Sequence, residues 1–198
     1  MARSVSSCFI TLVVLFLWRV EDVAEACTCM RVHPQQAFCR ADVVIRAKVV
    51  GVGAGSVHPI KYDIQQIKMF KGPDRDINAV FTPTFCPETL ETNKEYLLTG
   101  RLNTDGTMNI IMCDFIRTWD ASSDTQLMRL IQRYQSGCDC KIIPCSSLLC
   151  PISSRDECLW TDWLSGNGLS GPRAQSFACI RRRDGSCAWY SMSAQPGK

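Results

Sequence analysis

Two cysteines next to a predicted cleavage site, Cys27 and Cys29, are the residues of this chain best suited to do chemistry. Cleavage after Ala26 makes Cys27 the first mature residue, with a free α-amine beside its own carbonyl oxygen. That pair of atoms can grip a metal ion. If both cysteines form disulfides, the terminus is held at two points, whereas terminal residues are otherwise poorly ordered. The simpler alternative is that Cys27 is only the first half-cystine of a secreted domain.

Residues 1–26 have the parts of a secretory signal peptide. Arg3 lies in a short basic region, the apolar run 9–18 follows, and the small-x-small sequence Ala24-Glu25-Ala26 precedes the cleavage point. The apolar run is too short to span a bilayer. We therefore expect a protein secreted to the extracellular space and matrix, with no transmembrane segment.

The cysteines indicate an oxidising compartment and two domains. Of the 13 cysteines, Cys8 leaves with the signal peptide, and the remaining 12 form an even set, as complete pairing requires. Half of them are dispersed and half crowd the last third: Cys27, Cys29, Cys39, Cys86, Cys113 and Cys138, then Cys140, Cys145, Cys150, Cys158, Cys179 and Cys187. We place the domain boundary near Asp139, which gives domains at 27–138 and 139–198. The spacing leaves the pairing within each domain open.

The residue types favour a binding protein over an enzyme. Loss of residues 1–26 removes two basic and three acidic side chains, so the formal net charge changes from +3 to a mildly basic +4. Only two histidines occur, His33 and His58, so a catalytic zinc site built by this chain is not expected. No Ser-His-acid set or Gly-rich phosphate loop stands out. The cysteine spacings near the domain boundary are read as disulfides, because structural zinc is rare in such secreted chains.

Five segments rich in β-branched or alternating apolar residues predict a barrel. They are 42–50, 60–69, 79–82, 96–101 and 107–116, the last two joined across Asn103-Thr104-Asp105-Gly106. The alternation changes phase within 60–69, which predicts a bulge near Gln65-Gln66 of the kind that bends strands in small barrels. The pattern favours a mainly β fold with a few helices, built on a five-stranded Greek-key barrel of the OB type.

Two helices and a hairpin complete the prediction. Apolar residues at helical spacing predict a helix over 124–135 that packs on the barrel: Leu127, Leu130, Ile131 and Tyr134. Gly137 is placed to end it. Pro34 opens a shorter helix through Phe38. Asp184-Gly185 predicts a tight hairpin turn in the second domain, which is small enough to depend on its disulfides.

Several motifs carry a resemblance to a known family. They are Cys27-Thr28-Cys29, His33-Pro34-Gln35-Gln36-Ala37-Phe38-Cys39, Val44-Ile45-Arg46-Ala47-Lys48, Gln66-Ile67-Lys68-Met69-Phe70-Lys71-Gly72-Pro73, Cys113-Asp114-Phe115-Ile116, Glu157-Cys158-Leu159-Trp160 and Asp184-Gly185-Ser186-Cys187-Ala188-Trp189-Tyr190. Over essentially the whole mature chain they resemble the tissue inhibitors of metalloproteinases, most closely the type-two branch. The resemblance implies an OB-type, netrin-like N-terminal domain and a small disulfide-rich β domain at the C-terminus.

The resemblance also implies a disulfide pattern. Carried over position by position, the pairs are Cys27–Cys86, Cys29–Cys113, Cys39–Cys138, Cys140–Cys187, Cys145–Cys150 and Cys158–Cys179.

The implied function is a secreted inhibitor of matrix metalloproteinases, not an enzyme. The α-amine and carbonyl oxygen of Cys27 would chelate the catalytic zinc of the partner enzyme, so zinc is ligated in trans and no intrinsic cofactor is expected. Thr28 would enter a specificity pocket, and Cys29 and Met30 would continue along the cleft. Residues Thr84, Phe85, Cys86 and Pro87 would occupy the other side of that cleft.

Departures from the type-two pattern bear on partners. The connection from Val50 to Ile60 is short, and no acidic residue follows Asp184, so the acidic tail that docks on the haemopexin-like domain of progelatinase A is missing. We expect a monomer that binds the metalloproteinase catalytic domain and no nucleic acid. The competing function is a non-inhibitory, netrin-like secreted module for signalling or matrix binding. The cluster Arg181-Arg182-Arg183 is read as a solvated strand face, with a heparin or matrix contact as the alternative.

Overall fold

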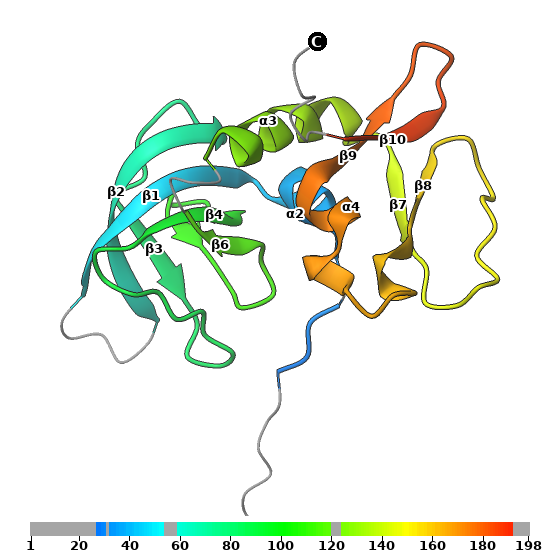
Figure 1. Cartoon of the computed structure of the whole chain (residues 1–198). Helices are drawn as coiled ribbons and strands as arrows, with labels where there is room; N and C mark the ends of the chain where they lie inside the picture. Colours follow the sequence, from blue (N-terminus) through cyan, green and yellow to red (C-terminus); the bar gives the residue numbers. More distant parts are fainter. Residues whose placement is uncertain (1–26, 31, 54–58, 120–123, 192–198) are drawn as a thin grey trace, which may run out of the picture.

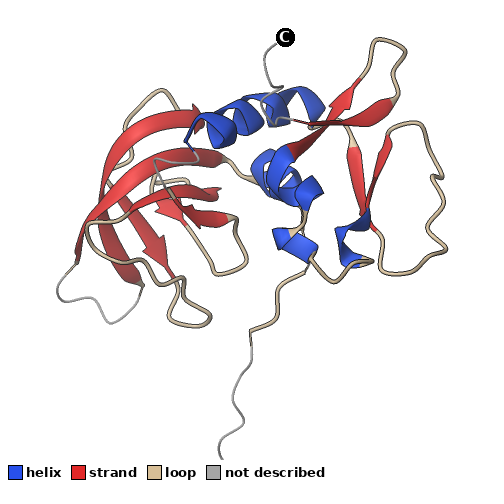
Figure 2. Cartoon of the chain, viewed as in Figure 1, coloured by secondary structure: helices blue, strands red, loops and turns tan. Residues whose placement is uncertain are grey.

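The computed structural model describes residues 27–30, 32–53, 59–119 and 124–191. These residues form a β-barrel and a C-terminal part of short strands and helices, with helix α2 (Pro34–Arg40) between them (Figures 1 and 2). The predicted signal peptide and the last residues, 192–198, lie outside the described part of the chain. No helix of the described part is long and apolar enough to cross a membrane.

Five strands close the barrel. In spatial order they are β1 (Val43–Val52), β2 (Ile60–Lys71), β3 (Ala79–Thr82), β5 (Met108–Asn109) and β4 (Glu95–Leu102). The ring closes because β4 also pairs with β1, and only the β3–β5 pair is parallel. The short strand β6 (Ile116–Thr118) lies against β4 as well. The predicted mainly β fold with a five-stranded barrel is confirmed.

Strand β1 is apolar on both faces at its start, which explains its opening run of β-branched residues. Val43, Ile45 and Val49 point into the barrel core and are fully buried. Val44 points to the other face, where it packs under helix α3 (Asp124–Tyr134). Both faces are therefore withdrawn from water at the start of the strand, whereas its far end is partly exposed.

The pairing of β1 with β2 contains the predicted bulge, one position later than expected. Arg46 lies opposite Lys68 and Ala47 opposite Gln66, so Ile67 is the extra residue of β2. A second irregularity follows at Phe70. Because an extra residue bends the strand and increases its twist, these bulges let β2 curl around the barrel.

The prediction of one strand over 107–116 is wrong. The segment forms β5 and β6 separately, both on the same edge of β4, with a turn between them. In this turn the Asp114 carboxylate accepts the backbone N–H of Ile111 at 2.8 Å, and Cys113 is bonded to Cys29. The Asp114 cap and the Cys29–Cys113 disulfide hold the residues between β5 and β6 in a turn, away from the hydrogen-bonded ladder with β4. The apolar pattern of the sequence therefore continues through this turn although the strand is interrupted.

Helix α3 packs on the outside of the barrel, as its apolar stripe predicts. Its buried side chains pack with residues of α2, β1, β4 and the C-terminal part: Leu127, Leu130, Ile131 and Tyr134 against Phe38, Val44, Leu97 and Ala178. The chain then tightens into a 3-10 helix, η2 (Gln135–Gly137). Helix α2 begins at Pro34 as predicted and ends at Arg40, two residues beyond the predicted end.

The C-terminal part has two small sheets around a core centred on Trp160. Parallel strands β7 (Lys141–Pro144) and β8 (Glu157–Trp160) form one sheet. Strands β9 (Phe177–Arg181) and β10 (Cys187–Ser191) form the predicted hairpin, with Gly185 at φ 81° in its turn. Short helices connect the sheets: η3 (Thr161–Trp163), η4 (Gly168–Ser170) and α4 (Pro172–Ser176).

Six disulfides hold this chain, and none in the described part crosses Asp139. They are Cys27–Cys86, Cys29–Cys113, Cys39–Cys138, Cys140–Cys187, Cys145–Cys150 and Cys158–Cys179, the same pairs that the resemblance implies.

Non-covalent contacts nevertheless join the two sides of Asp139 closely. Ala178 belongs to the apolar cluster under α3, and a Cβ added at Gly137 would overlap the backbone carbonyl of Cys179. Gly137 therefore does more than end a helix, because it lets β9 approach the backbone after α3. The barrel and the C-terminal part share a packed interface.

Candidate functional site

The segment Cys27–Met30 is irregular and is held to the barrel by two disulfides. Cys27 is bonded to Cys86 with a Cα–Cα distance of 5.8 Å, and Cys29 to Cys113 with 5.2 Å. Thr28, between the two bridged cysteines, is exposed. Two anchors in three residues fix the course of the backbone while leaving the side chain between them free to contact a partner.

A second exposed segment, Thr84–Pro87, lies beside the first because it carries Cys86. Cys86 has φ 54°, which is unusual for a residue with a side chain, so the backbone bends sharply at the bridge. Phe85 is 64% exposed, and Met30 on the other segment is 81% exposed. Large apolar side chains this exposed are typical of contact surfaces. We call segments 27–30 and 84–87 together the bridged edge.

The barrel wall supports the loop that contains Thr84–Pro87. The Tyr96 hydroxyl accepts the backbone N–H of Glu91 at 3.0 Å, and Thr82 Oγ1 accepts that of Glu88 at 2.9 Å. The Tyr62 hydroxyl lies 3.4 Å from both the Glu88 carbonyl oxygen and the Leu90 amide. These side chains replace the strand pairing that the loop lacks. Sequence analysis assigned them to strands but gave them no part in the site.

Two carboxylates lie close behind the bridged edge. Burial raises the pKa of Glu88, and the negative charge of Asp114 raises it further. Burial also raises the pKa of Asp114, although the Ile111 N–H and the charge of Arg101 oppose the shift. Glu88 follows Cys86 by two residues and Asp114 follows Cys113 directly, so the effect of Asp114 on Glu88 indicates that the two disulfide-bearing loops are neighbours.

The bridged edge continues into helix α2 through a buried histidine. His33 caps the helix: its Nδ1 accepts the Gln35 N–H at 3.1 Å, and the Gln36 side chain returns to the His33 backbone. Its Nε2 lies 3.2 Å from the Arg173 carbonyl oxygen, so the neutral ring donates there. Desolvation lowers the pKa of His33 to about 4, against the Arg173 hydrogen bond and the charge of Asp162. His33 is therefore a structural residue that caps α2 and joins it to the C-terminal part.

Gln35 joins α2 to the C-terminal part. Its side chain is buried, its Oε1 accepts the Cys179 N–H at 2.8 Å, and its Nε2 donates to the Cys179 carbonyl at 2.7 Å. One amide thus satisfies both backbone groups of a residue 144 positions away. The His-Pro-Gln-Gln sequence signals a capped helix, but it holds no sign of this distant partner.

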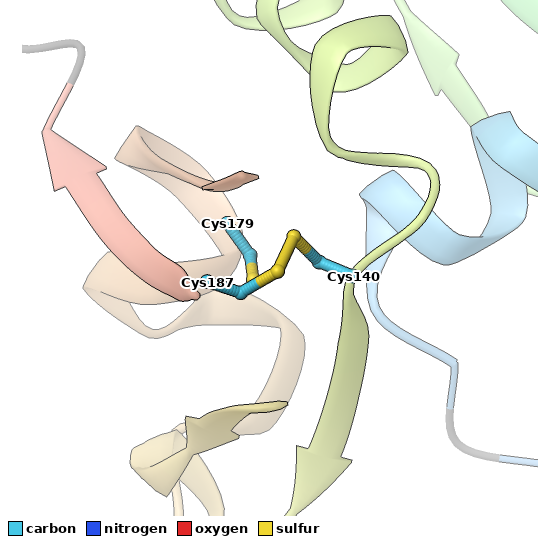
Figure 3. A group of neighbouring side chains, drawn as sticks. All are labelled: Cys140, Cys179 and Cys187. Carbon is cyan, nitrogen blue, oxygen red and sulfur yellow. A yellow bond between two sulfur atoms is a disulfide. The ribbon is translucent and has the colours of Figure 1, made fainter. Parts of the chain in front are cut away.

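Three cysteines approach one another in the C-terminal core, but they do not form a metal site. The sulfur atoms of Cys140, Cys179 and Cys187 lie within 4.8 Å of one another (Figure 3). Cys140 is bonded to Cys187, and Cys179 to Cys158. Metals bind cysteine as the thiolate, which a disulfide does not offer. The cluster is therefore two adjacent disulfides.

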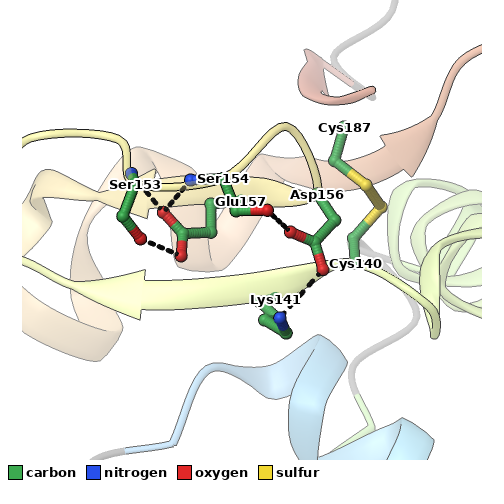
Figure 4. A network of polar contacts seen from close by, with 7 residues as sticks. All are labelled: Cys140, Lys141, Ser153, Ser154, Asp156, Glu157 and Cys187. Carbon is green, nitrogen blue, oxygen red and sulfur yellow. Dashed lines mark hydrogen bonds and ion pairs between the residues drawn. A yellow bond between two sulfur atoms is a disulfide. The ribbon is translucent and has the colours of Figure 1, made fainter. Parts of the chain in front are cut away.

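Polar contacts order the base of the loop that joins β7 to β8. The Glu157 carboxylate accepts the Ser153 hydroxyl at 2.6 Å and the Ser153 and Ser154 backbone N–H groups (Figure 4). Asp156 accepts the Ser154 hydroxyl and pairs with Lys141 at 3.0 Å. Hydrogen bonds from the serines are the main cause that lowers the pKa of both acids. The loop tip is closed by Cys145–Cys150.

The bridged edge is chemically a contact surface. It presents exposed side chains and two disulfides, and the predicted cleavage after Ala26 would add one amine beside its neighbouring carbonyl. Among the described residues we find no nucleophile–base pair within it. The geometry of these residues suits contact with a partner.

Comparisons with known proteins show what the chain is similar to. Residues 25–189 match the family model described as tissue inhibitor of metalloproteinase. The chain is 50% identical over 199 residues to metalloproteinase inhibitor 2 of Gallus gallus, covering 93% of this chain and 90% of that protein. The human protein of that name is 50% identical over 187 residues, with 87% and 85% covered. That of Cricetulus longicaudatus is 51% identical over 186 residues, with 87% and 95% covered.

Proposed function

The chain belongs to the tissue inhibitor of metalloproteinase family, and from this premise we propose that it is a secreted protein inhibitor of metalloproteinases rather than an enzyme. The bridged edge would enter the active-site cleft of the target protease. The single observation that carries this proposal is the double tether of Cys27–Met30, which holds an exposed terminus beside Thr84–Pro87.

The proposed metal contact needs two donor atoms, and Cys27 provides two. A catalytic zinc is held by three protein ligands with water in the open position, and it can expand to five ligands. The Cys27 α-amine and carbonyl oxygen would replace that water. They are too few to hold a metal alone, and the Cys27 sulfur is in a disulfide. The chain would therefore bring no metal of its own and would bind that of the enzyme.

The neighbouring residues would fix the orientation. Thr28 would enter the specificity pocket next to the zinc, Cys29 and Met30 would follow the cleft as a substrate does, and Phe85 would contact the opposite side. No peptide bond of the inhibitor would then lie over the metal in a position to be cut. A backbone ordered before binding loses little entropy in the complex, which favours tight inhibition from a modest area.

The test is to change the amine without changing the fold. We expect that acetylating Cys27, or leaving one extra alanine before it, abolishes inhibition of a matrix metalloproteinase catalytic domain, because the nitrogen can no longer bind zinc. Thr28→Gly should weaken inhibition only partly, since it keeps the chelating atoms. Circular dichroism checks that every variant is folded. Full potency of the folded, acetylated protein would refute zinc chelation and favour a non-inhibitory netrin-like role.

A further inference from the structure

A groove lies between the bridged edge and the C-terminal part. Its volume is about 500 Å³, and residues from both domains line it, among them Met30, Gln36, Arg40, Pro144, Ser146 and Trp163. Ser146 lies in the short loop after β7 that the Cys145–Cys150 disulfide closes. Gln36 Nε2 donates to the Ile142 carbonyl at 3.0 Å, which links the two walls. The groove therefore exists only where the two domains meet.

The described residues of the walls combine an apolar surface with the guanidinium of Arg40. Met30, Pro144 and Trp163 provide apolar atoms. Arg40 is exposed at the end of α2, and among the described residues its guanidinium has no hydrogen bond or ion pair. Asp114 lies with Arg40 along a neighbouring cavity, but its carboxylate already accepts the Ile111 N–H. A guanidinium next to apolar walls suits a carboxylate flanked by apolar side chains.

Continuity with the bridged edge identifies the occupant. Met30 belongs to that edge and also lines the groove. A protease that holds Cys27–Met30 in its cleft therefore already lies at the mouth of the groove. A second contact with the same molecule forms at high effective concentration, whereas another protein would have to bind independently.

We propose that this groove binds a surface segment of the target metalloproteinase that carries a carboxylate beside an apolar side chain, with Arg40 as the ion-pair partner. This inference rests on the proposed inhibitory function and extends it from the cleft to an adjoining surface. It makes the C-terminal domain part of the contact and makes the choice of protease depend on Arg40.

The experiment uses the full-length mature chain and a matrix metalloproteinase catalytic domain. We expect Arg40→Glu to raise the dissociation constant about tenfold and Arg40→Ala about threefold, and the effect of charge reversal should shrink at high salt. Arg183→Glu is the matched control, because Arg183 is an exposed arginine on the β9–β10 turn, outside the groove lining. It should change the constant less than about twofold.

A second pair of variants tests occupancy of the groove. Ser146→Trp fills the groove from an exposed position and should weaken binding about tenfold, whereas Ser147→Trp, one residue farther along and outside the lining, should not. If Arg40→Glu and Ser146→Trp inhibit like the wild type, the groove proposal is refuted and zinc-site inhibition stands. If only the arginine change matters, the groove is not occupied. If the wild type does not inhibit at all, the proposed function itself fails.

Discussion

His33 shows how one buried residue makes stability depend on pH. Its ring lies 5.1 Å from that of Trp160 and 5.2 Å from that of Trp189, centroid to centroid, and it caps α2 through the neutral Nδ1. A proton on Nδ1 would remove the acceptor of the Gln35 N–H. Since α2 lies between the two domains, protonation of this ring weakens the interface and the helix together.

We predict that the protein loses stability as pH falls through the weakly acidic range because of His33. The pKa of His33 is about 4 in the folded chain, below the ordinary histidine value of 6.5, so the unfolded chain binds the proton more readily. The contribution of neutral His33 to the free energy of unfolding is complete above pH 6.5 and is lost toward pH 4. At about pH 5 the free energy of unfolding should be lower by about 2 kcal/mol. Denaturant unfolding across this pH range measures the change, and the His33→Asn variant serves as a control whose helix cap does not titrate. Equal pH dependence of stability in the wild type and the variant would contradict the prediction.

At the scale of elements, the loop behind the bridged edge depends on the strands beneath it. The Tyr96 hydroxyl, from β4, accepts the backbone N–H of Glu91 at 3.0 Å. Tyr96 lies in a strand whose other side chains fill the core. The order of a loop at the protein surface is thus set by a residue that the strand pattern alone assigns to packing.

We expect Tyr96→Phe to lower the free energy of unfolding by about 1 kcal/mol, because the Glu91 N–H loses its partner. The same change should loosen Thr84–Pro87 and raise the dissociation rate from a metalloproteinase severalfold. Surface plasmon resonance gives the rate, and Tyr190→Phe is the control, since Tyr190 lies on the distant β10 and its hydroxyl accepts only from Arg182 in the described structure. A dissociation rate unchanged by Tyr96→Phe would show that this loop does not depend on the hydroxyl.

At the scale of the whole molecule, the two domains are covalently independent but physically joined. Each disulfide lies within one domain, while Gln35 and Ala178 connect the domains by hydrogen bonds and apolar packing. The first domain has its own barrel core, whereas the second packs against α2 and α3. Separating the two domains should therefore change the stability of each by a different amount.

A chain that ends after Cys138 should fold and still inhibit a metalloproteinase catalytic domain. It keeps the barrel and three disulfides, while Gln35 and the apolar face of α2 become exposed to water, so its melting temperature should be lower than that of the full chain. Calorimetry and inhibition assays test both points. Failure of the oxidised, truncated chain to fold would show that the interface is required for the first domain.

The C-terminal residues give a further prediction for the whole molecule, because no acidic residue follows Asp184 in the sequence. Appending an acidic tail after Lys198 should tighten binding to the haemopexin-like domain of progelatinase A and make it more salt-sensitive, because long-range attraction between opposite charges is added. Titrations at two salt concentrations measure the effect, with a neutral tail of equal length as control. Equal affinity of the acidic and neutral tails would contradict it.

The local elements of this protein can be predicted from the amino-acid sequence alone. The spacing of apolar residues and the positions of proline and glycine predict strands β1 to β4, helices α2 and α3 and the β9–β10 hairpin. These features are local, because each depends on only a few neighbouring residues. The family motifs also imply the Cys27–Cys86 disulfide, which places Cys27–Met30 beside Thr84–Pro87. Local order and the resemblance were enough to point at the bridged edge.

The contacts between these elements depend on how the whole chain packs. The break between β5 and β6, the Gln35–Cys179 contact, the close approach at Gly137 and the groove beside Arg40 each depend on residues far apart in the chain. The spacing of apolar residues in the sequence shows which face of an element a side chain occupies, but not which distant backbone group it contacts there. The packing of the barrel, α2 and the C-terminal sheets determines that contact, because close packing leaves each buried polar group few partners.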